Sequence, residues 1–461
     1  MKFNTAYLIR ISLVSALGGL LFGYDWVVIG GAKPFYEKFF EITGSPNLQG
    51  WAMSSALLGC IAGAMISGVL SEKYGRKKSL IISAFLFTLS AIGTGFSNDL
   101  STFITFRLLG GIGIGLASTQ SPIYIAEVSP GTLRGRFVSL NQLTIVIGIL
   151  LAQITNFLIA DAVDPGATNE AIINSWNGQW GWRWMFWAES VPALLFFLLT
   201  FGIPESPRWL AKSGYWSKAE KILVKIGGME FAKHSGEEIA KTIQNLSERF
   251  NFSALKQKNI FPILIIGVVL AVFQQWCGIN VVFNYAEEVF AAAGYGISDI
   301  LFNIILTGSV NLLFTFVAIS TVDRWGRKNL MLLGAAGLAV SYIVLGTLYY
   351  LEIQGFMVVL IVIIAIAVYA MTLAPITWVI LSEIFPNSVR GSAMAVATAS
   401  LWIACFVLTY TFPWLNKTLN SFGTFWLYAF ICILGFVYIK RKLIETKGKT
   451  LEEVENLLTK K

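Results

Sequence analysis

Charged residues are scarce in this chain. They make up 13% of its 461 residues, whereas 56% are hydrophobic. A soluble protein of this length carries about a quarter charged residues, so the composition excludes a soluble globular fold. Apolar runs of about 20 residues, each long enough to cross a bilayer, recur from one end of the sequence to the other. The sequence therefore predicts an all-α membrane protein with many spans.

Histidine and cysteine are also rare, and this removes most catalytic chemistry. The one histidine, His234, lies in a polar stretch, and the four cysteines (Cys60, Cys277, Cys405 and Cys432) are far apart in apolar runs. They form no metal-binding or redox motif, and the sequence shows no nucleophile–base pair or phosphate-binding loop. We therefore expect no enzyme activity, no cofactor and no bound metal.

The apolar runs predict twelve spans, and the basic residues orient them. The links after spans two, four, six, eight and ten carry Lys and Arg, whereas the opposite links carry mainly acids. By the positive-inside rule, both termini and the long central link are cytoplasmic. The net charge of +8 follows this topology, so we expect no nucleic-acid partner. The first apolar run is too long for a cleavable signal peptide and lacks a small-residue cleavage site, so we expect none. The predicted spans are residues 8–31, 48–72, 79–97, 101–126, 136–160, 181–203, 260–291, 298–321, 329–350, 356–381, 392–412 and 422–440.

Two motifs each occur twice. Gly75-Arg76-Lys77 follows span two, and Gly326-Arg327-Lys328 follows span eight. A Glu–Arg–Gly motif covers residues 127–135 after span four and residues 383–391 after span ten. The copies are about 250 residues apart, which predicts two six-span halves related by duplication. Repeated transporter halves place their binding site near the midplane of the membrane.

These boundaries predict four parts of the chain. The link between the halves offers two capping boxes, Ser217 with Glu220 and Ser235 with Glu238, which predict two short helices. We interpret the link as a helical brace on the cytoplasmic side. The predicted parts are an N-terminal half (1–203), a helical linker (204–258), a C-terminal half (259–442) and a cytoplasmic tail (443–461).

Span seven carries four amides, Gln274, Gln275, Asn280 and Asn284. A polar group moved out of water without a partner costs about 2–7 kcal/mol, so such residues face a bundle interior or a watery path. On a regular helix Gln274, Asn280 and Asn284 share one side and Gln275 lies on the other. Gly278 can loosen the helix and turn the two groups towards each other. Amides supply donors and acceptors, which suits an uncharged ligand with many hydroxyls. The alternative is that they join packed helices.

Three ionisable residues lie six or more residues from the ends of their spans: Asp25, Arg107 and Glu189. Their positions place them at a similar depth, and an unpaired charge there costs roughly 2.5–3.5 kcal/mol. We therefore expect Arg107 to pair with the carboxylates. Two acids and one base leave one negative charge in excess, which makes the group a candidate proton acceptor. The alternative is a static structural ion pair.

Together these residues resemble the sugar porter family of the major facilitator superfamily. The resemblance covers nearly the whole chain. It rests on the two Gly-Arg-Lys motifs, on Pro-Glu-Ser-Pro-Arg-Trp-Leu at 204–210, on Gln-Gln-x-x-Gly-x-Asn at 274–280 and on Glu-Thr-Lys-Gly-Lys-Thr-Leu-Glu-Glu at 445–453. It implies the major facilitator fold and alternating access by rocking of the two halves.

The resemblance also assigns roles to single residues. It implies proton coupling by Asp25, with Arg107 and Glu189 in the same network. The implied sugar-binding set is Phe22, Gln142, Gln274, Gln275, Asn280, Asn284, Asn311, Trp378 and Trp402. The implied conformational latch is Glu72, Arg76, Glu127, Arg134, Glu205, Arg208, Asp323, Arg327, Glu383 and Arg390.

The chain departs from the family pattern at three pocket positions. Leu401 and Ile149 stand where glutamines are expected, and Asn284 stands where a tyrosine is usual. These changes alter the hydroxyl-binding capacity and leave the identity of the sugar open.

The sequence therefore predicts a proton-coupled symporter that imports a neutral monosaccharide, such as xylose or glucose. Its expected partners are the sugar, protons and the lipid bilayer of the plasma membrane, and we expect it to function as a monomer. A facilitative uniporter on the same fold is the first alternative, and Asp25 argues against it. A non-transporting sugar sensor is the second, and the short tail argues against it.

Overall fold

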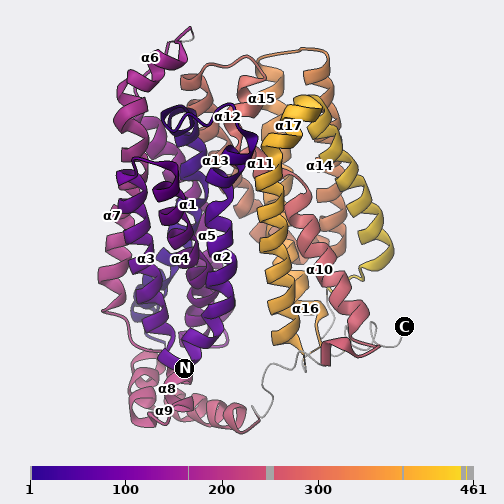
Figure 1. The fold of residues 1–461 in the computed structure, drawn as a ribbon. Helices are drawn as coiled ribbons and strands as arrows, with labels where there is room; N and C mark the ends of the chain where they lie inside the picture. The colour runs from indigo at the N-terminus through magenta and orange to yellow at the C-terminus, as the bar shows by residue number, and fades with distance from the viewer. Residues whose placement is uncertain (1–2, 165, 246–253, 387–388, 448–452, 454–461) are drawn as a thin grey trace. The chain divides into compact units, whose positions relative to one another are not determined.

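The computed structural model describes residues 3–164, 166–245, 254–386, 389–447 and 453. Within this part of the chain every regular element is a helix (Figure 1). Ten of these helices are long and apolar enough to cross a membrane. The predicted all-α membrane fold is confirmed, and the chain is a multi-pass membrane protein.

Two further observations account for twelve spans among the described residues. α7 is a shorter apolar helix, and the 53-residue α17 has a non-helical residue, Asn420, with φ 55° and ψ 175°. The spans are α1 (Thr5–Phe39), α2 (Pro46–Tyr74), α3 (Arg76–Phe96), α4 (Leu100–Val128), α5 (Arg134–Ile159), α7 (Trp182–Thr200), α10 to α12 (Phe261–Trp276, Ile279–Asn284, Ala286–Ala291), α13 (Ile297–Trp325), α14 (Arg327–Tyr350), α15 and α16 (Phe356–Met371, Leu373–Ile384), and the two parts of α17 (Arg390–Lys442).

The helices differ from the predicted spans in three places. α1 continues eight residues beyond the predicted end of span one, to Phe39. Spans seven and ten are not continuous, because helical geometry stops at Cys277–Gly278 and at Thr372. The gap predicted between spans eleven and twelve is helical except at Asn420.

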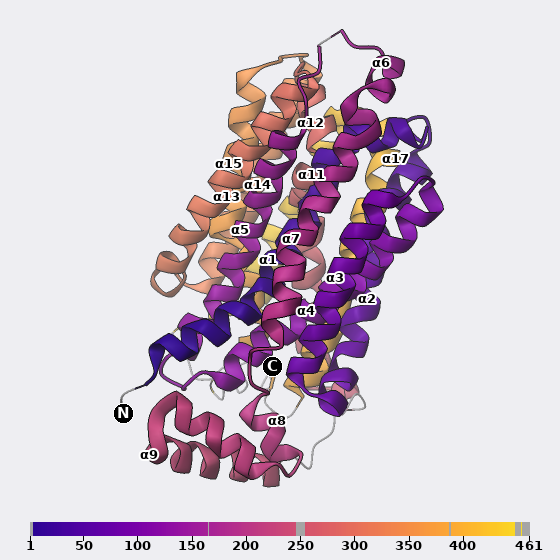
Figure 2. The ribbon, with the colours of Figure 1, turned by 90° about the vertical axis from the view of Figure 1, so that its left-hand side faces the viewer.

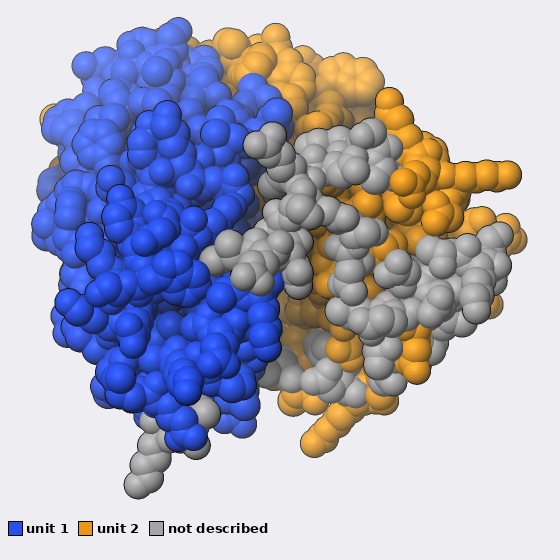
Figure 3. Space-filling model, turned by 90° about the horizontal axis from the view of Figure 1, so that it is seen from below, with its two compact units in different colours: residues 1–28, 55–152, 183–249 blue, residues 29–54, 153–182, 250–461 orange. Residues whose placement is uncertain are grey.

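The chain forms two compact units (Figure 3). Unit 1 comprises Met1–Val28, Ser55–Ala152 and Arg183–Arg249. Unit 2 comprises Ile29–Ser54, Gln153–Trp182 and Phe250–Lys461. The predicted division at residues 203, 258 and 442 follows different boundaries and stays a prediction.

Small residues bring backbones together inside unit 1. A Cβ on Gly111 of α4 would lie 1.9 Å from the carbonyl oxygen of Ala56 on α2, and one on Gly63 would lie 2.3 Å from that of Ile112. Such close approach is how helices pack in a membrane, where burial from water contributes little. In unit 2, α17 packs against both α10 and α14.

The linker is helical, as predicted, but its caps were predicted wrongly. α8 (Pro207–Lys212) is capped by Ser206, whose side chain accepts from the backbone N–H of Trp209. α9 (Trp216–Asn245) bends at Gly228, where φ is 82°. Ser217 and Ser235 both lie within α9, because its helical turns begin earlier than the capping pattern indicated.

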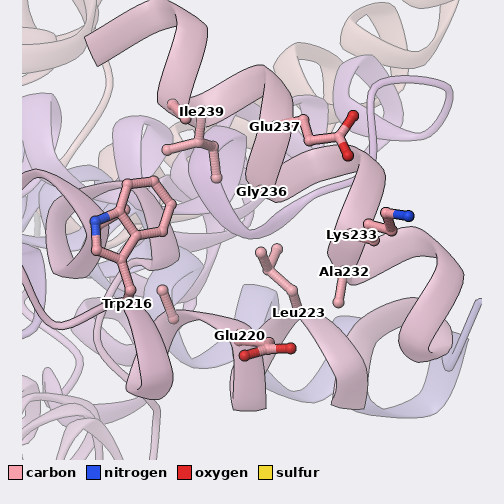
Figure 4. Close-up of a pocket in the computed structure, with 11 residues that line it drawn as sticks. Trp216, Glu220, Leu223, Ala232, Lys233, Gly236, Glu237 and Ile239 are labelled. Carbon is pink, nitrogen blue, oxygen red and sulfur yellow. The ribbon is translucent and has the colours of Figure 1, made fainter. Parts of the chain in front are cut away.

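The linker packs against its own unit. α8 and α9 lie side by side near the N-terminus (Figure 2), and the N–H of Asn4 donates to the carbonyl oxygen of Ile226 at 2.8 Å. A hollow of about 280 Å³ in the linker is lined in part by Trp216, Leu223 and Ile239 (Figure 4). The remaining short elements are α6 (Asn169–Asn174), the π-helical turn η1 (Asn177–Gly181) and the 3₁₀ turn η2 (Ala254–Lys256).

Candidate functional site

A buried ion pair lies in unit 1. One terminal nitrogen of Arg107 on α4 donates to Oδ1 of Asp25 on α1, and the other lies 3.4 Å from the backbone carbonyl oxygen of Asp25. Asp25 is 1% exposed and Arg107 is 2% exposed. The guanidinium carbon also lies 5.7 Å from the ring centre of Phe186. Oδ2 of Asp25 accepts no hydrogen bond from the described residues.

A second carboxylate belongs to the same neighbourhood. Glu189 on α7 is 2% exposed and interacts electrostatically with both Asp25 and Arg107. Gly110, on the turn of α4 that follows Arg107, leaves the space beside Oδ2 of Asp25, since a Cβ there would lie 3.3 Å from that oxygen. Three buried ionisable groups, two acids and one base, thus lie in one neighbourhood.

The four amides of span seven lie in unit 2, where the helix is interrupted. Gly278 has φ 87°, a conformation that favours glycine. The break ends α10 after Trp276 and starts α11 at Ile279, so Asn280 comes close to Gln275 and donates to its Oε1. Gln275 in turn donates to Oε1 of Gln274. The interruption expected at Gly278 is confirmed, and it joins amides that a straight helix would hold apart.

This amide chain is anchored by neighbouring helices. Nε2 of Gln274 donates to the hydroxyl of Tyr369 on α15 at 2.6 Å, and Asn280 lies 3.7 Å from Sγ of Cys405 on α17. Asn284 is 4% exposed, and its side-chain oxygen accepts no hydrogen bond from the described residues. Interlocked amides present a fixed row of donors and acceptors.

The other residues of the predicted sugar-binding set divide between the units. In unit 2, Asn311 on α13 and Trp402 on α17 are 6% and 4% exposed, whereas Trp378 on α16 is 38% exposed. In unit 1, Phe22 and Gln142 are partly buried, and the ring of Phe22 lies edge-on to Trp26 at 6.0 Å. The assignment of all nine residues to sugar binding stays a prediction.

The first Gly-Arg-Lys motif forms a charge network in unit 1. Arg76 donates two parallel hydrogen bonds of 2.9 Å to the carboxylate of Glu127. Glu205 accepts from the backbone N–H of Arg76 at 2.9 Å and of Lys77 at 3.2 Å, so it caps the start of α3. Ser206 donates to Glu127. A carboxylate at a helix N-terminus complements the free N–H groups there.

The second motif builds the same network in unit 2. Arg327 lies 3.1 Å from Oε1 of Glu383. Glu445 accepts from the backbone N–H of Arg327 at 2.9 Å and of Lys328 at 3.1 Å, and Thr446 donates to Glu383 at 2.5 Å. Glu445 and Thr446 therefore have the same roles in unit 2 as Glu205 and Ser206 have in unit 1. These roles of Glu445 and Thr446 were not predicted from the sequence.

Glycine makes room for the capping carboxylate in both networks. Gly75 has φ 96° and Gly326 has φ 86°. A Cβ at these positions would lie 2.2 Å from Oε2 of Glu205 and 2.6 Å from Oε2 of Glu445.

The remaining predicted latch residues have weaker contacts. Glu72 pairs with Lys212 at 3.2 Å on the surface. Arg134 and Arg390 donate to the backbone carbonyl oxygens of Ala126 and Phe385. Arg208 is exposed, and the side chain of Asp323 is not among those that the structure describes.

Sequence reasoning missed two further buried polar groups in unit 2. Lys33 and Glu37 on α1 pair with each other, and Lys33 also pairs with Glu287 and Glu288 on α12, but span one was predicted to end at residue 31. Their i,i+4 spacing was the available signal. Gln153 on α5 is 1% exposed, and neither its nitrogen nor its oxygen has a hydrogen-bond partner among the described residues. Asn156 lies three residues further along the same span, but Gln142 was the only amide of that span singled out from the sequence.

Comparison with known proteins identifies the family to which the chain belongs. A family model described as "Sugar (and other) transporter" matches residues 11–458. The D-xylose-proton symporter of Escherichia coli (strain K12) is 39% identical over 99% of this chain and 96% of its own. The arabinose-proton symporter of Bacillus subtilis (strain 168) is 38% identical over 99% and 96%. A solved inward-open conformation of the xylose transporter XylE from E. coli matches with a TM-score of 0.85 and 38% identity, covering 98% of this chain and 99% of that one.

The twelve-span helical fold and these similarities together identify a membrane transporter. The chain belongs to the sugar (and other) transporter family, and the resemblance seen in its motifs is confirmed. Membership of this family also confirms that the chain is a transporter and not an enzyme.

Proposed function

We propose that this protein is a proton-coupled symporter that imports a neutral monosaccharide by rocking alternating access. The observation that carries the proposal is the Asp25–Arg107 pair, which is sealed from solvent beside a second acid, Glu189. A buried acid that is held by one base, with another acid nearby, gains or loses a proton when its surroundings change. Relatives described as D-xylose-proton and arabinose-proton symporters support the same coupling.

We assign the proton to Asp25. Its Oδ1 is held by Arg107, whereas Oδ2, beside Gly110, accepts no hydrogen bond from the described part of the chain and can take a proton. A uniporter has no need of a buried acid at this position, and burying one is costly. The second candidate function is a uniporter. In that case Asp25 and Arg107 form a static ion pair beside Glu189.

We assign sugar binding to the interlocked amides. Gln274, Gln275 and Asn280 form one hydrogen-bonded row, and Asn284 adds an oxygen that has no hydrogen-bond partner among the residues the structure describes. This supply of donors and acceptors without charge suits hydroxyls and does not suit an anion or a cation. Gln142, Phe22, Asn311, Trp378 and Trp402 complete the proposed set.

We further propose the topology of the protein in the membrane. Both termini and the linker face the cytoplasm, because the Gly-Arg-Lys motifs and the linker gather the basic residues on one side. The two charge networks around Arg76 and Arg327 act as conformational latches on that side. The protein acts as a monomer in a bacterial inner membrane.

The test uses purified wild-type protein in sealed liposomes. Xylose, arabinose, glucose or galactose is added outside, and a dye reports the pH of the lumen. We expect one or more of these sugars to acidify the lumen as it enters. Sugar entry without a change in lumenal pH would make the protein a uniporter.

A further inference from the structure

Lys33 is the centre of a buried ion cluster that is separate from the proposed proton site. Its Nζ lies 3.2 Å from Glu37 on α1, and 3.0 Å from Glu287 and 2.7 Å from Glu288 on α12. The side chains of Lys33 and Glu37 are 3% and 4% exposed, and those of Glu287 and Glu288 are 19% and 23% exposed. All four residues belong to unit 2.

The backbone brings these charges together. α1 passes close to the broken span seven, because Gly30 has no side chain. A Cβ on Gly30 would lie 3.0 Å from the carbonyl oxygen of Phe283 and 3.3 Å from that of Asn284. Lys33 is three residues further along α1, so it lies beside the next short helix, α12.

One cation holds three acids in this cluster. No other base is paired with Glu37, Glu287 or Glu288 among the described residues. The other neighbours are neutral: Gln49 donates to Glu37 at 2.8 Å, and the ring of Tyr285 lies 5.9 Å from Nζ of Lys33. Tyr36 also interacts electrostatically with Lys33. Without Lys33, three neighbouring carboxylates would repel one another across the two helices.

We propose that Lys33 is the lock that closes the outer end of the transport path, by tying the end of α1 to α12. The proposal rests on the proposed function, which places this end of α1 outside. Such a lock must hold the end of α1 firmly against α12 in the closed state. When the two helices separate, it must not leave unpaired charges in an apolar environment. An ammonium group is strongly hydrated, and carboxylates are too, so water replaces each contact when the ends separate.

The lysine contacts a short helix, α12, that is joined to α11 at a bend. Tyr285, between α11 and α12, has φ −118° and ψ 34°, so the chain bends between the two helices. Glu287 and Glu288 lie in the first turn of α12, and both reach Lys33. A short segment joined at a bend can move while α10 stays in place.

The test measures the distance between the two ends directly. Spin labels are attached at Glu41→Cys and Ala291→Cys, two exposed positions beyond the cluster, after the four buried cysteines are replaced. Pulsed electron resonance then gives the distance distribution, without sugar or a proton gradient. We expect Lys33→Met to raise the ratio of long to short distances at least tenfold.

Two variants make the result specific. Lys38→Met removes the same charge from the same helix, but Lys38 donates to the carbonyl oxygen of Pro34 in its own helix, so we expect no change. Exchanging the charges in Lys33→Glu with Glu288→Lys keeps one cation among three acids, and we expect the wild-type distribution to return.

An unchanged distribution in Lys33→Met would overturn the proposal. So would a charge exchange that stays as open as Lys33→Met. If Lys33→Met does not fold while the exchanged variant does, the cluster is a static brace and the lock is also overturned. None of these readings depends on transport, so a failure of the proposed symport is seen separately in the liposome assay.

Discussion

Single buried polar residues carry the chemistry of this protein, and each must be judged by its partners. Asp25, Arg107 and Lys33 are buried with partners of opposite charge. Gln153 is buried, and its side-chain amide has no hydrogen-bond partner among the described residues. A buried group without a hydrogen bond costs stability, so its presence in the fold calls for a measurable consequence.

We predict that Gln153→Leu raises the unfolding temperature. The change removes two polar atoms that have no hydrogen-bond partner in the described part of the chain, and it keeps the size of the side chain, which favours the folded state by about 1–3 kcal/mol. Gln120→Leu is the matched control, because Nε2 of Gln120 donates to Oγ of Ser67 at 2.6 Å, and we expect this change to lower the unfolding temperature. Thermal unfolding in detergent measures both, and shifts of the same sign would contradict the prediction.

At the scale of elements, breaks in the helices decide where chemistry is placed. α10 and α11 would be one helix without Gly278, and Gln275 and Asn280 would then point to different sides. The break is local and depends on a single left-handed residue. The sequence indicated it because a glycine followed a pair of amides, whereas the stop at Thr372 had no such signal and went unpredicted.

We predict that Gly278→Ala weakens both the fold and sugar binding. A side chain in the left-handed conformation costs about 1–2 kcal/mol, and the new Cβ would lie 2.7 Å from the ring of Tyr428. We expect a lower unfolding temperature and about tenfold weaker sugar binding, which corresponds to about 1.4 kcal/mol. Gly296→Ala is the control, because nothing lies within 4 Å of its Cβ position and its φ is −75°. Equal effects of the two changes would contradict this account.

The cap on α3 gives a pH-dependent prediction. Burial raises the pKa of the Glu205 carboxyl, and hydrogen bonds from the N–H groups of Ser206, Lys77 and Arg76 partly offset this. A raised pKa means that the folded protein binds the proton more tightly than the unfolded chain. The proton on Glu205 therefore adds its full contribution to the free energy of unfolding below the ordinary pKa of about 4.3. This contribution is lost as the pH rises through the raised pKa of the folded protein.

Glu205→Gln removes this titration. We expect the unfolding temperature of the wild type, relative to that of Glu205→Gln, to fall as the pH is raised from about 4.3. Thermal unfolding in detergent over a pH series checks this. Parallel curves for the two proteins would show that Glu205 has the same pKa folded and unfolded.

At the scale of the whole molecule, the sequence predicted the architecture well and the contacts unevenly. Long apolar runs have one stable solution in a bilayer, so the spans were predictable from hydrophobicity. The repeated motifs around Arg76 and Arg327 were visible because their letters recur. The link from Arg327 to Glu445 was not, because Glu445 follows the last span and no pattern in the sequence joins that tail to the second Gly-Arg-Lys motif. Lys33 was missed because hydrophobicity does not show that α1 continues to Phe39.

The central claim is that Asp25 carries the transported proton, and one measurement tests it most directly. Asp25→Asn is placed in sealed liposomes with the pH dye in the lumen, beside the wild type. Asp99→Asn is the control, because Asp99 is an exposed cap on α4 and asparagine caps equally well. We predict that Asp25→Asn loses the sugar-dependent acidification and keeps the exchange of labelled sugar. Acidification that continues unchanged in Asp25→Asn would contradict the account and would leave Asp25 as a structural partner of Arg107.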